Sequence, residues 1–341
     1  MDFSSDTSAP AHPKVIEAIA KANSGQASSY GGDDLTAALE AQIKAVFETD
    51  ELAIWPTASG TAANALALSC ICPPTHSILC HQDAHIEQDE RGAPEFFTGG
   101  AKLALLSGEN GKLSPADVAD HLETVDLNFV HAVPPAVLSI TNLTEWGTVY
   151  TPTEISELAR IAHAHDLSLH LDGARLANAL ATLGCSPAEL TWKSGVDVLT
   201  LGLTKTGAIG CEIIVLFGKA MANVPALRAR AKRSGHMPPK LRYLSAQGLA
   251  LLEDGLWLDL ARHANAMATT LSSRLLEHQG VSLITPVQGN EVFAQLPAPL
   301  AEKVSEAGWR FYPWPGGGYR FVCSWTTQLE DVDRAFAALR D

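Results

Sequence analysis

Apolar, strand-like segments alternate with helical segments along most of the chain, and this alternation limits the fold more than any other feature of the sequence. The strand-like segments lie at 77–82, 101–106, 137–142, 167–172, 196–202 and 211–217. Apolar spacing predicts helices at 13–22, 34–48 and 153–166, the second beginning at Asp33 or Asp34 and the third at Thr153 or Ser156. Parallel strands need such crossover helices, so we expect an α/β fold with a mostly parallel central sheet flanked by helices.

The character of the sequence changes near residue 246. A long helical stretch at 245–278 is followed by short strand-like segments at 290–296 and 319–325 and then by a final helical segment. A chain of 341 residues is long enough for two domains. We therefore expect a large domain at residues 1–245, which includes the N-terminal segment, and a smaller α+β domain at residues 246–341.

The charge and hydropathy of the chain exclude several kinds of partner. A formal net charge of −14 provides no dominant basic field to attract nucleic acid or an anionic membrane, and the densest basic stretch, 228–242, is short. No apolar run approaches the roughly 20 residues that span a bilayer. The first ten residues carry neither the basic nor the apolar region of a secretory signal, so we expect a cytoplasmic protein.

Six cysteines in a chain of this length do not indicate a disulfide framework, and we expect reduced thiols. Three of them lie close in sequence to three histidines, which also suggests a zinc site: Cys70, Cys72 and Cys80 with His76, His81 and His85. The spacing matches no paired zinc-binding motif, and free cysteine is among the most often buried residues. We therefore expect core packing and no metal site.

Lys205 follows the apolar run at 196–202 and precedes a glycine-containing turn. An arbitrary loop lysine is usually exposed, but this one follows a strand that should be buried. Burial disfavours the ammonium form and so lowers the pKa of a lysine, and the free amine can form an imine with an aldehyde cofactor. Ligands of α/β proteins bind beyond the carboxyl ends of the strands, which is where Lys205 is expected to lie.

Asp172 ends the run at 167–172 and so falls at the same edge of the sheet. A buried carboxylate there can keep the pyridine nitrogen of a cofactor protonated or cap the following helix, and the two roles are compatible. Arg175 can pair with Asp172 or face a phosphate. Ser59, Gly60 and Thr61 precede an alanine-rich helix, where N–H groups, hydroxyl groups and the helix dipole favour a phosphate.

These segments together resemble one enzyme family. SGTAAN at 59–64, His85, LDGAR at 171–175 and Thr204-Lys205 look like the pyridoxal-phosphate enzymes of the aspartate aminotransferase type. Within that fold the chain is most similar to the low-specificity L-threonine and L-allo-threonine aldolases. The resemblance covers nearly the whole chain and includes SSDT at 4–7, YGGDD at 30–34 and RAKRSGHM at 230–237. It implies a pyridoxal-phosphate-dependent transferase-like fold and pyridoxal 5′-phosphate as the cofactor.

The resemblance also implies roles for the matching residues. Lys205 would hold the cofactor as a Schiff base, and Asp172 would partner the pyridine nitrogen. The phosphate would be bound by Gly60, Thr61 and Thr204, with the hydroxyl of Ser59 as a further donor. Arg175 would lie near the cofactor ring or its O3′ side. His85 would stack on the ring, and His131 would lie near the substrate hydroxyl.

Residues that bind the amino-acid substrate follow from the same resemblance. Ser5 and Arg320 would bind its carboxylate. Tyr30, in the YGGDD segment, would complete the site of a neighbouring subunit in a homotetramer built as a dimer of dimers.

The chain departs from the family pattern in three places. Many members carry a carboxylate-binding arginine where this chain has Pro238, and either Lys240 or Arg242 would replace that charge. The sequence ITNLTEWG at 140–147 stands where others have Glu-Asn-Thr, and Thr206 replaces the usual glycine after the lysine.

The implied reaction is reversible retro-aldol cleavage of a β-hydroxy-α-amino acid, such as L-threonine, L-allo-threonine or phenylserine, to glycine and an aldehyde. His131, His85 or a water positioned by them would take the β-hydroxyl proton. His163, His165 and His170 are interpreted as ordinary helix or strand residues. The alternatives are another reaction on the same cofactor, such as β-elimination or transamination, and a noncatalytic cofactor- or metal-binding regulator. The sequence leaves the preferred substrate and its β-carbon configuration open.

Overall fold

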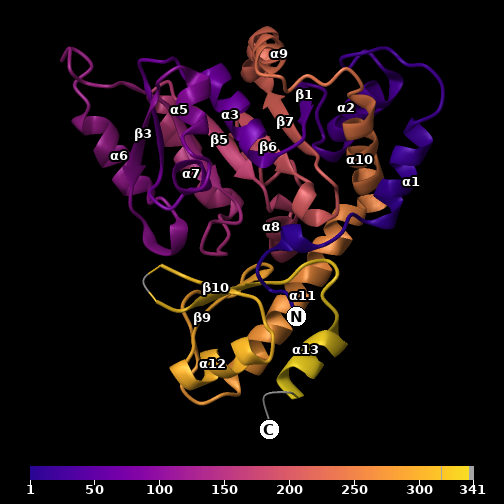
Figure 1. The fold of residues 1–341 in the computed structure, drawn as a ribbon. Helices are drawn as coiled ribbons and strands as arrows, with labels where there is room; N and C mark the ends of the chain where they lie inside the picture. Colours follow the sequence, from indigo (N-terminus) through magenta and orange to yellow (C-terminus); the bar gives the residue numbers. More distant parts are fainter. Residues whose placement is uncertain (316, 338–341) are drawn as a thin grey trace.

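A computed structural model describes residues 1–315 and 317–337 (Figure 1). Its main feature is a seven-stranded sheet in the order β1-β7-β6-β5-β4-β2-β3, in which only β7 runs antiparallel to its neighbours. The strands are β1 (Leu52–Thr57), β2 (Ser77–His81), β3 (Lys102–Leu106), β4 (Pro135–Thr141), β5 (Ser168–Gly173), β6 (Val198–Gly202) and β7 (Glu212–Phe217). All six strands expected from the apolar runs are present, and the predicted α/β architecture is confirmed.

Helices cover both faces of this sheet (Figure 1). They are α1 (Pro13–Ala22), α2 (Asp34–Val46), α3 (Gly60–Ile71), α4 (His85–Gln88), α5 (Ala93–Thr98), α6 (Pro115–Thr124), α7 (Pro152–Ala164), α8 (Leu176–Leu183), α9 (Val224–Arg233), α10 (Arg242–Leu252) and α11 (Leu256–Leu276). Alternate residues of β6 and β7 point to opposite faces. Val198 and Ile214 belong to a core cluster with residues of α3 and α9, whereas Leu199 and Ile213 belong to another, which includes residues of α7, α8 and α10.

The start of one helix and the continuity of another differ from the sequence prediction. The third expected helix begins at Pro152 and is capped by Thr151, not by Thr153 or Ser156. The Thr151 side chain accepts a hydrogen bond from the N–H of Glu154, whose carboxylate accepts one from the N–H of Thr151. The long helical stretch at 245–278 is broken, because Asp254 and Gly255 adopt positive φ angles of 53° and 72° between α10 and α11.

A second, smaller sheet lies below the first in Figure 1. It is antiparallel in the order β10-β11-β9-β8, made of β8 (Ser282–Leu283), β9 (Glu291–Gln295), β10 (Tyr312–Pro313) and β11 (Tyr319–Val322), and it lies with α12 (Ala298–Glu306) and α13 (Leu329–Ala337). Phe3 packs in its core together with residues of α11 and α13. The N-terminal segment therefore joins the small sheet before it reaches the large one. The proposed division of the chain at residues 245 and 246 stays a prediction.

The cysteines lie where core packing places them. Cys72 and Cys80 are buried among apolar side chains of one core cluster, and Cys70 packs against another. In the described ranges, no three His, Cys, Asp or Glu side chains converge in a way that could hold a metal ion. No described helix is both long enough and apolar enough to cross a membrane.

His170 on β5 is a fully buried histidine held between neighbouring strands. Its Nδ1 lies 2.9 Å from Oγ of Ser139 on β4, and its Nε2 lies 3.3 Å from Oγ1 of Thr200 on β6. Burial lowers the pKa of His170 to about 4, although the negative charge of Asp172 acts in the opposite direction. The interpretation of His170 as an ordinary strand residue fits these contacts.

We expect His170 to make unfolding depend on pH. Its pKa is depressed in the folded protein, so its contribution to stability is complete above pH 6.5 and is lost as pH falls towards 4, by about 3 kcal/mol. His170→Asn should lose that part of the pH dependence, as measured by urea unfolding between pH 4.5 and 7.5. His165→Asn, at an exposed position, is the matched control. Parallel curves for wild type and His170→Asn would contradict the expectation.

Candidate active site

A cavity of about 280 Å³ lies at the edge of the large sheet where the parallel strands end. Eight of the residues expected from the sequence line it: Ser59, Gly60, Thr61, His85, Asp172, Arg175, Thr204 and Lys205. They come from the start of α3, the start of α4, the end of β5 and the turn after β6. The structure thus brings together segments that are up to about 150 residues apart in the sequence.

Asp172 lies at the end of β5, with 3% of its surface exposed. Its Oδ2 accepts a hydrogen bond of 2.7 Å from the side-chain amide of Asn64, and its Oδ1 accepts one of 2.9 Å from the N–H of Ala174. Both oxygens are therefore fixed at the cavity wall. Asp172 holds the turn after β5 rather than capping α8, whose N-cap is Arg175.

The start of α3 forms another wall of the cavity. Ser59 caps the helix, and its Oγ accepts a hydrogen bond of 3.3 Å from the N–H of Ala62. Gly60 faces open space, because a Cβ added there would have no protein atom within 4 Å. The free N–H groups of the first helical turn and the helix dipole favour an anion at this position.

Lys205 is carried by the short 3₁₀ turn Thr204–Thr206 that follows β6. Thr204 Oγ1 accepts a hydrogen bond of 3.1 Å from the N–H of Cys211, and its side chain also bonds Glu212. Glu212 in turn accepts a hydrogen bond of 3.0 Å from the N–H of Leu203. These contacts fix the turn, whereas the half-buried Lys205 amine has no hydrogen bond or ion pair to any residue that the structure describes.

Glu212 lines the cavity although the sequence did not single it out. It is the first residue of β7 and is 6% exposed. Because β7 runs antiparallel, its amino end lies at the edge where the other strands have their carboxyl ends. Burial raises the pKa of Glu212 to about 7, against the opposing effects of Thr204 and the Lys205 charge.

His85 is linked to Asp172 through two further side chains. Its Nδ1 lies 2.8 Å from Oε1 of Glu90, and the Asn64 amide donates to that same oxygen at 2.9 Å and to Asp172 at 2.7 Å. Burial alone would lower the pKa of His85, but the Glu90 hydrogen bond and the negative charges of Asp172 and Glu90 raise it. The Nδ1 atom is engaged by Glu90, so only Nε2 remains to contact a ligand.

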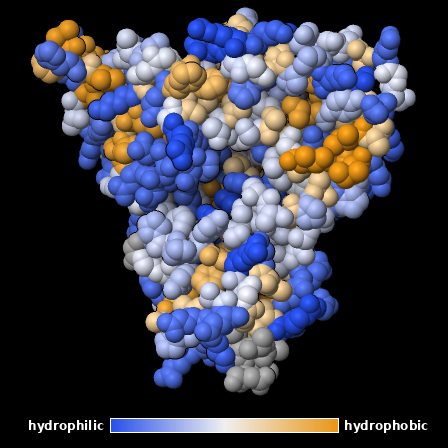
Figure 2. Space-filling model, in the orientation of Figure 1, coloured by the Kyte–Doolittle hydropathy of each residue, from blue (hydrophilic) through white to orange (hydrophobic). Residues whose placement is uncertain are grey.

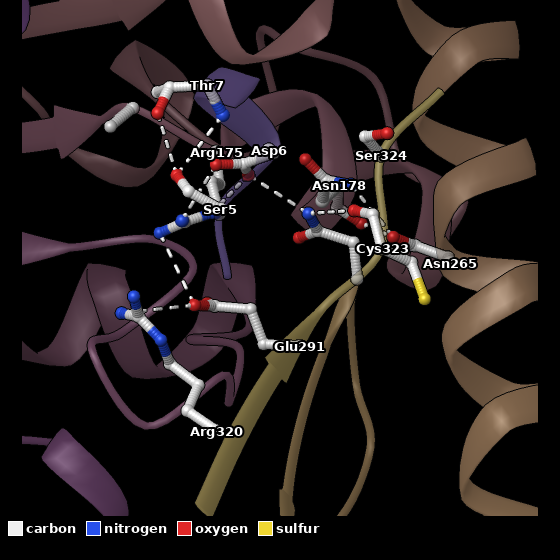
Figure 3. A network of polar contacts seen from close by, with 12 residues as sticks. Ser5, Asp6, Thr7, Arg175, Asn178, Asn265, Glu291, Arg320, Cys323 and Ser324 are labelled. Atoms are coloured by element: carbon white, nitrogen blue, oxygen red, sulfur yellow. Dashed lines mark hydrogen bonds and ion pairs between the residues drawn. The ribbon is translucent and has the colours of Figure 1, made fainter. Parts of the chain in front are cut away.

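Two arginines and two carboxylates meet beside the cavity (Figure 3). Arg175 binds Asp6 with two hydrogen bonds, from Nε at 2.7 Å and from Nη2 at 3.1 Å. Arg175 Nη1 lies 3.6 Å and Arg320 Nη1 lies 3.9 Å from Oε1 of Glu291. Arg175 therefore does not pair with Asp172, one of the two alternatives left open for it, because Asp6, near the start of the chain, takes this place.

The surroundings of Asp6 favour the ionised form of its carboxyl group. Burial would raise its pKa, but the charges of Arg175 and Lys205 and the hydrogen bonds from Arg175 and Asn290 lower it. Ser5 precedes it and bonds Thr7, whose side chain reaches the cavity. Ser5 and Arg320 (Figure 3) are not among the residues that line the cavity, although Ser5 bonds Thr7 of the wall and Arg320 lies near Glu291.

Three of the expected site residues lie away from the cavity. His131 is exposed, in the connection between α6 and β4, and packs edge-on against Phe129 at 5.0 Å. Tyr30 is 46% exposed, with Lys232 Nζ 4.0 Å from its ring centre. Lys240 is exposed as well. One chain alone does not bring these side chains to the site.

The loop that carries His131 is also apolar. Leu127, Phe129 and Val130 are 72%, 56% and 87% exposed. Figure 2 shows an apolar tip at its upper left, and further apolar patches lie on the same face, among them one on the right.

Arg242, the other residue expected to replace the family's charge at Pro238, does not reach the cavity either. Arg242 donates to the carbonyl of Gly25 at 3.4 Å and stacks on Tyr243. Neither Lys240 nor Arg242 therefore replaces, within one chain, the charge that the family has at Pro238.

Comparison with known proteins agrees with the site. The family described as beta-eliminating lyase matches residues 2–298. The low specificity L-threonine aldolase of Pseudomonas sp. is 44% identical over 340 residues, 99% of this chain and 96% of the relative. A Leishmania major threonine aldolase structure superposes with a TM-score of 0.92 at 29% identity, covering 99% of this chain and 98% of that one. A Thermus thermophilus aspartate aminotransferase, at 16% identity and a TM-score of 0.73 over 99% of this chain and 90% of that one, shares the fold.

Proposed function

Because the chain belongs to the beta-eliminating lyase family, among the low-specificity L-threonine aldolases, we propose that it cleaves β-hydroxy-α-amino acids to glycine and an aldehyde with pyridoxal phosphate as its cofactor. L-Threonine and L-allo-threonine are the proposed substrates, with phenylserine as a further one. The observation that carries the proposal is that a lysine amine and a fixed carboxylate, Lys205 and Asp172, line one cavity at the sheet edge.

The cavity residues fit pyridoxal phosphate. Lys205 has an uncommitted amine for its aldehyde, and Asp172 has a fixed carboxylate for its pyridine nitrogen. The open space at Gly60 and the start of α3 suit its phosphate, with Ser59 and Thr61 alongside. His85 would lie against the ring. When bound, the cofactor supplies an electron sink for the negative charge that bond cleavage leaves on the substrate Cα.

The arginines beside the cavity fit the carboxylate of the substrate. Asp6 holds Arg175 Nε and Nη2, which leaves Nη1 directed at Glu291, and Arg320 Nη1 approaches the same carboxylate from the small sheet. Neither oxygen of Glu291 has a hydrogen-bond partner among the residues that the structure describes. We propose that the substrate carboxylate binds Arg320, with Ser5 and Arg175 nearby, and that this contact orients the Cα–Cβ bond for cleavage.

Oligomer formation would account for the three distant residues. We propose a homotetramer in which Tyr30, Lys240 and His131 act at the site of a neighbouring copy, which is supported by their exposure in the single chain. We also propose a cytoplasmic location. All six cysteines have free thiols, which fits a reducing compartment.

The products formed from threonine test the proposed reaction. We expect the purified holoenzyme to convert L-threonine and L-allo-threonine to equal amounts of glycine and acetaldehyde. Glycine can be followed by ¹H NMR, and acetaldehyde by its reduction with NADH and alcohol dehydrogenase. The D-enantiomers serve as controls and should give no aldehyde.

β-Elimination is a second candidate because the matching family is described by that reaction. It would release ammonia and a 2-oxo acid from threonine instead of glycine and acetaldehyde. Those products, in place of an aldehyde, would replace the proposed function with an elimination. Neither set of products, together with no cofactor absorbance, would indicate a noncatalytic protein.

A further inference from the structure

The carboxyl group of Glu145 lies in the cavity wall, and none of the functions proposed above involves it. It lies in the connection that follows β4, one turn beyond Thr141. Its Oε1 accepts hydrogen bonds from the N–H of His85 at 2.8 Å and from Oγ1 of Thr141 at 2.9 Å. Its Oε2 is buried and has no hydrogen-bond partner within the described part of the chain.

These contacts fix Glu145 relative to the rest of the site. Thr141 pairs with Asp172 across β4 and β5, so the residue that holds Oε1 is a direct neighbour of Asp172 in the sheet. The other partner is the backbone of His85, at the start of α4. Glu145 is therefore tied to two elements that carry cofactor-site residues, while Oε2 is left free.

The other carboxyl groups of the cavity are already committed. Asp172 uses both oxygens, and Glu212 holds the turn that carries Lys205. Among the described residues that line the cavity, only Glu145 combines a carboxyl group with an unpartnered oxygen. A buried oxygen without a hydrogen bond carries a free-energy cost, which a hydroxyl group entering the cavity can remove.

The surroundings of Glu145 also suit the uptake and release of a proton by its carboxyl group near neutral pH. Removal of the carboxyl group from solvent raises the pKa of Glu145 to about 7, and the negative charge of Asp172 adds to this effect against the hydrogen bonds from His85 and Thr141. A base whose pKa lies near the working pH balances availability against proton affinity. The pKa of His85 shifts upwards as well, but its Nδ1 is already held by Glu90.

We propose that Glu145 takes the β-hydroxyl proton of the substrate during cleavage. The proposal rests on the aldol reaction proposed above. The proton passes from the hydroxyl to the carboxylate of Glu145, and the O–H electron pair becomes the second C–O bond of the aldehyde. The Cα–Cβ bond breaks, its electron pair stays on Cα, and Cα then takes one proton to give glycine. Glu145 returns its proton to solvent, so the atoms and charges balance.

Glu145→Gln tests this role because it keeps an oxygen for His85 and Thr141 but cannot take the proton as a carboxylate does. We expect kcat for L-threonine cleavage to fall about 100-fold or more. Exchange of the glycine α-proton in D₂O, followed by ¹H NMR, should stay within about threefold of wild type, because that reaction removes no hydroxyl proton. The cofactor absorbance of the purified variant should be unchanged.

The pH dependence adds an independent readout. A carboxylate base must be ionised, so wild-type kcat/KM for threonine should fall as pH drops below about 7. This fall in kcat/KM at low pH should be absent from the residual activity of Glu145→Gln. Glu157 is an exposed glutamate of α7, and Glu157→Gln is the matched control. It should keep both the wild-type rate and the fall in kcat/KM at low pH.

Each remaining outcome overturns the role. Equal losses of cleavage and glycine exchange, or loss of the cofactor absorbance, would make Glu145 a structural residue. Wild-type cleavage rates in Glu145→Gln would exclude it as the base. If wild-type enzyme releases no aldehyde from threonine, the proposed function fails together with this role, whereas aldehyde release at the same rate by both proteins overturns the role alone.

Discussion

Lys205→Ala is expected to lower kcat for threonine cleavage by about 10³-fold or more. Lys205 is the only amine among the described residues that line the cavity, so no neighbour can replace it as the covalent attachment for the cofactor aldehyde. The loss should not come from unfolding. The turn is held by Thr204, Glu212 and backbone contacts, and the Lys205 amine takes part in none of them.

Two measurements separate these effects. Aldehyde release gives the rate, and borohydride reduction followed by peptide mass spectrometry locates the attachment of the cofactor. Wild-type protein should carry the reduced cofactor on Lys205, and the variant should carry none. Lys102→Ala, at an exposed position of β3, should behave as wild type in both assays. Labelling of another lysine, or turnover within tenfold of wild type, would contradict the assignment.

The parallel strands explain why Lys205 and Asp172 could be located from the sequence. Asp172 ends one apolar run and Lys205 follows another, and the carboxyl ends of parallel strands meet at one edge of a sheet. Glu212 could not be found by that reasoning, because it begins a strand. It reaches the site only because β7 is antiparallel, and strand direction is set by tertiary packing rather than by the local sequence.

Long-range partners account for the other missed residues. Arg175 pairs with Asp6, 169 positions away, and with Glu291 of the small sheet, and no local pattern predicts such contacts. Glu145 lies in the connection whose sequence departs from the family pattern, so the resemblance gave no role to transfer. Glu145 lies just beyond the end of a predicted parallel strand, and this position was the sequence signal that could have identified it as a site residue. The roles of His131, Tyr30 and Lys240 came from the resemblance alone, and they stay predictions that need a second copy of the chain.

Asp172→Asn is expected to lower kcat by about 100-fold or more while leaving the protein folded. The change removes the negative charge that would keep the cofactor ring nitrogen protonated, so the ring becomes a poorer electron sink. It also disturbs the hydrogen bonds. Both oxygens of Asp172 accept from N–H donors, so the new amide nitrogen must face either Asn64 or Ala174, at a cost of about 1–3 kcal/mol.

The change at Asp172 also requires a control that removes a carboxylate charge at a distant position. Asp197 also accepts from a backbone N–H, that of Leu169, and from a side chain, His163, both at Oδ2, and it lies outside the cavity. Asp197→Asn can keep both bonds through its amide oxygen and should keep kcat at saturating cofactor. If both variants lose activity in proportion to their stability, the electronic role of Asp172 fails.

The charge effect of Asp172 can also be read at His85 without any turnover. Asp172 is one of the charges that raise the pKa of His85, so Asp172→Asn should lower that pKa, whereas Asp197→Asn should leave it unchanged. NMR titration of the imidazole, assigned with a His85→Asn variant, measures both shifts. A fall in the His85 pKa together with a fall in kcat would tie the rate to the charge of Asp172, since a purely structural role gives no reason for the two to change together. An unchanged His85 titration in Asp172→Asn would show that this carboxylate does not set the electrostatics of the site.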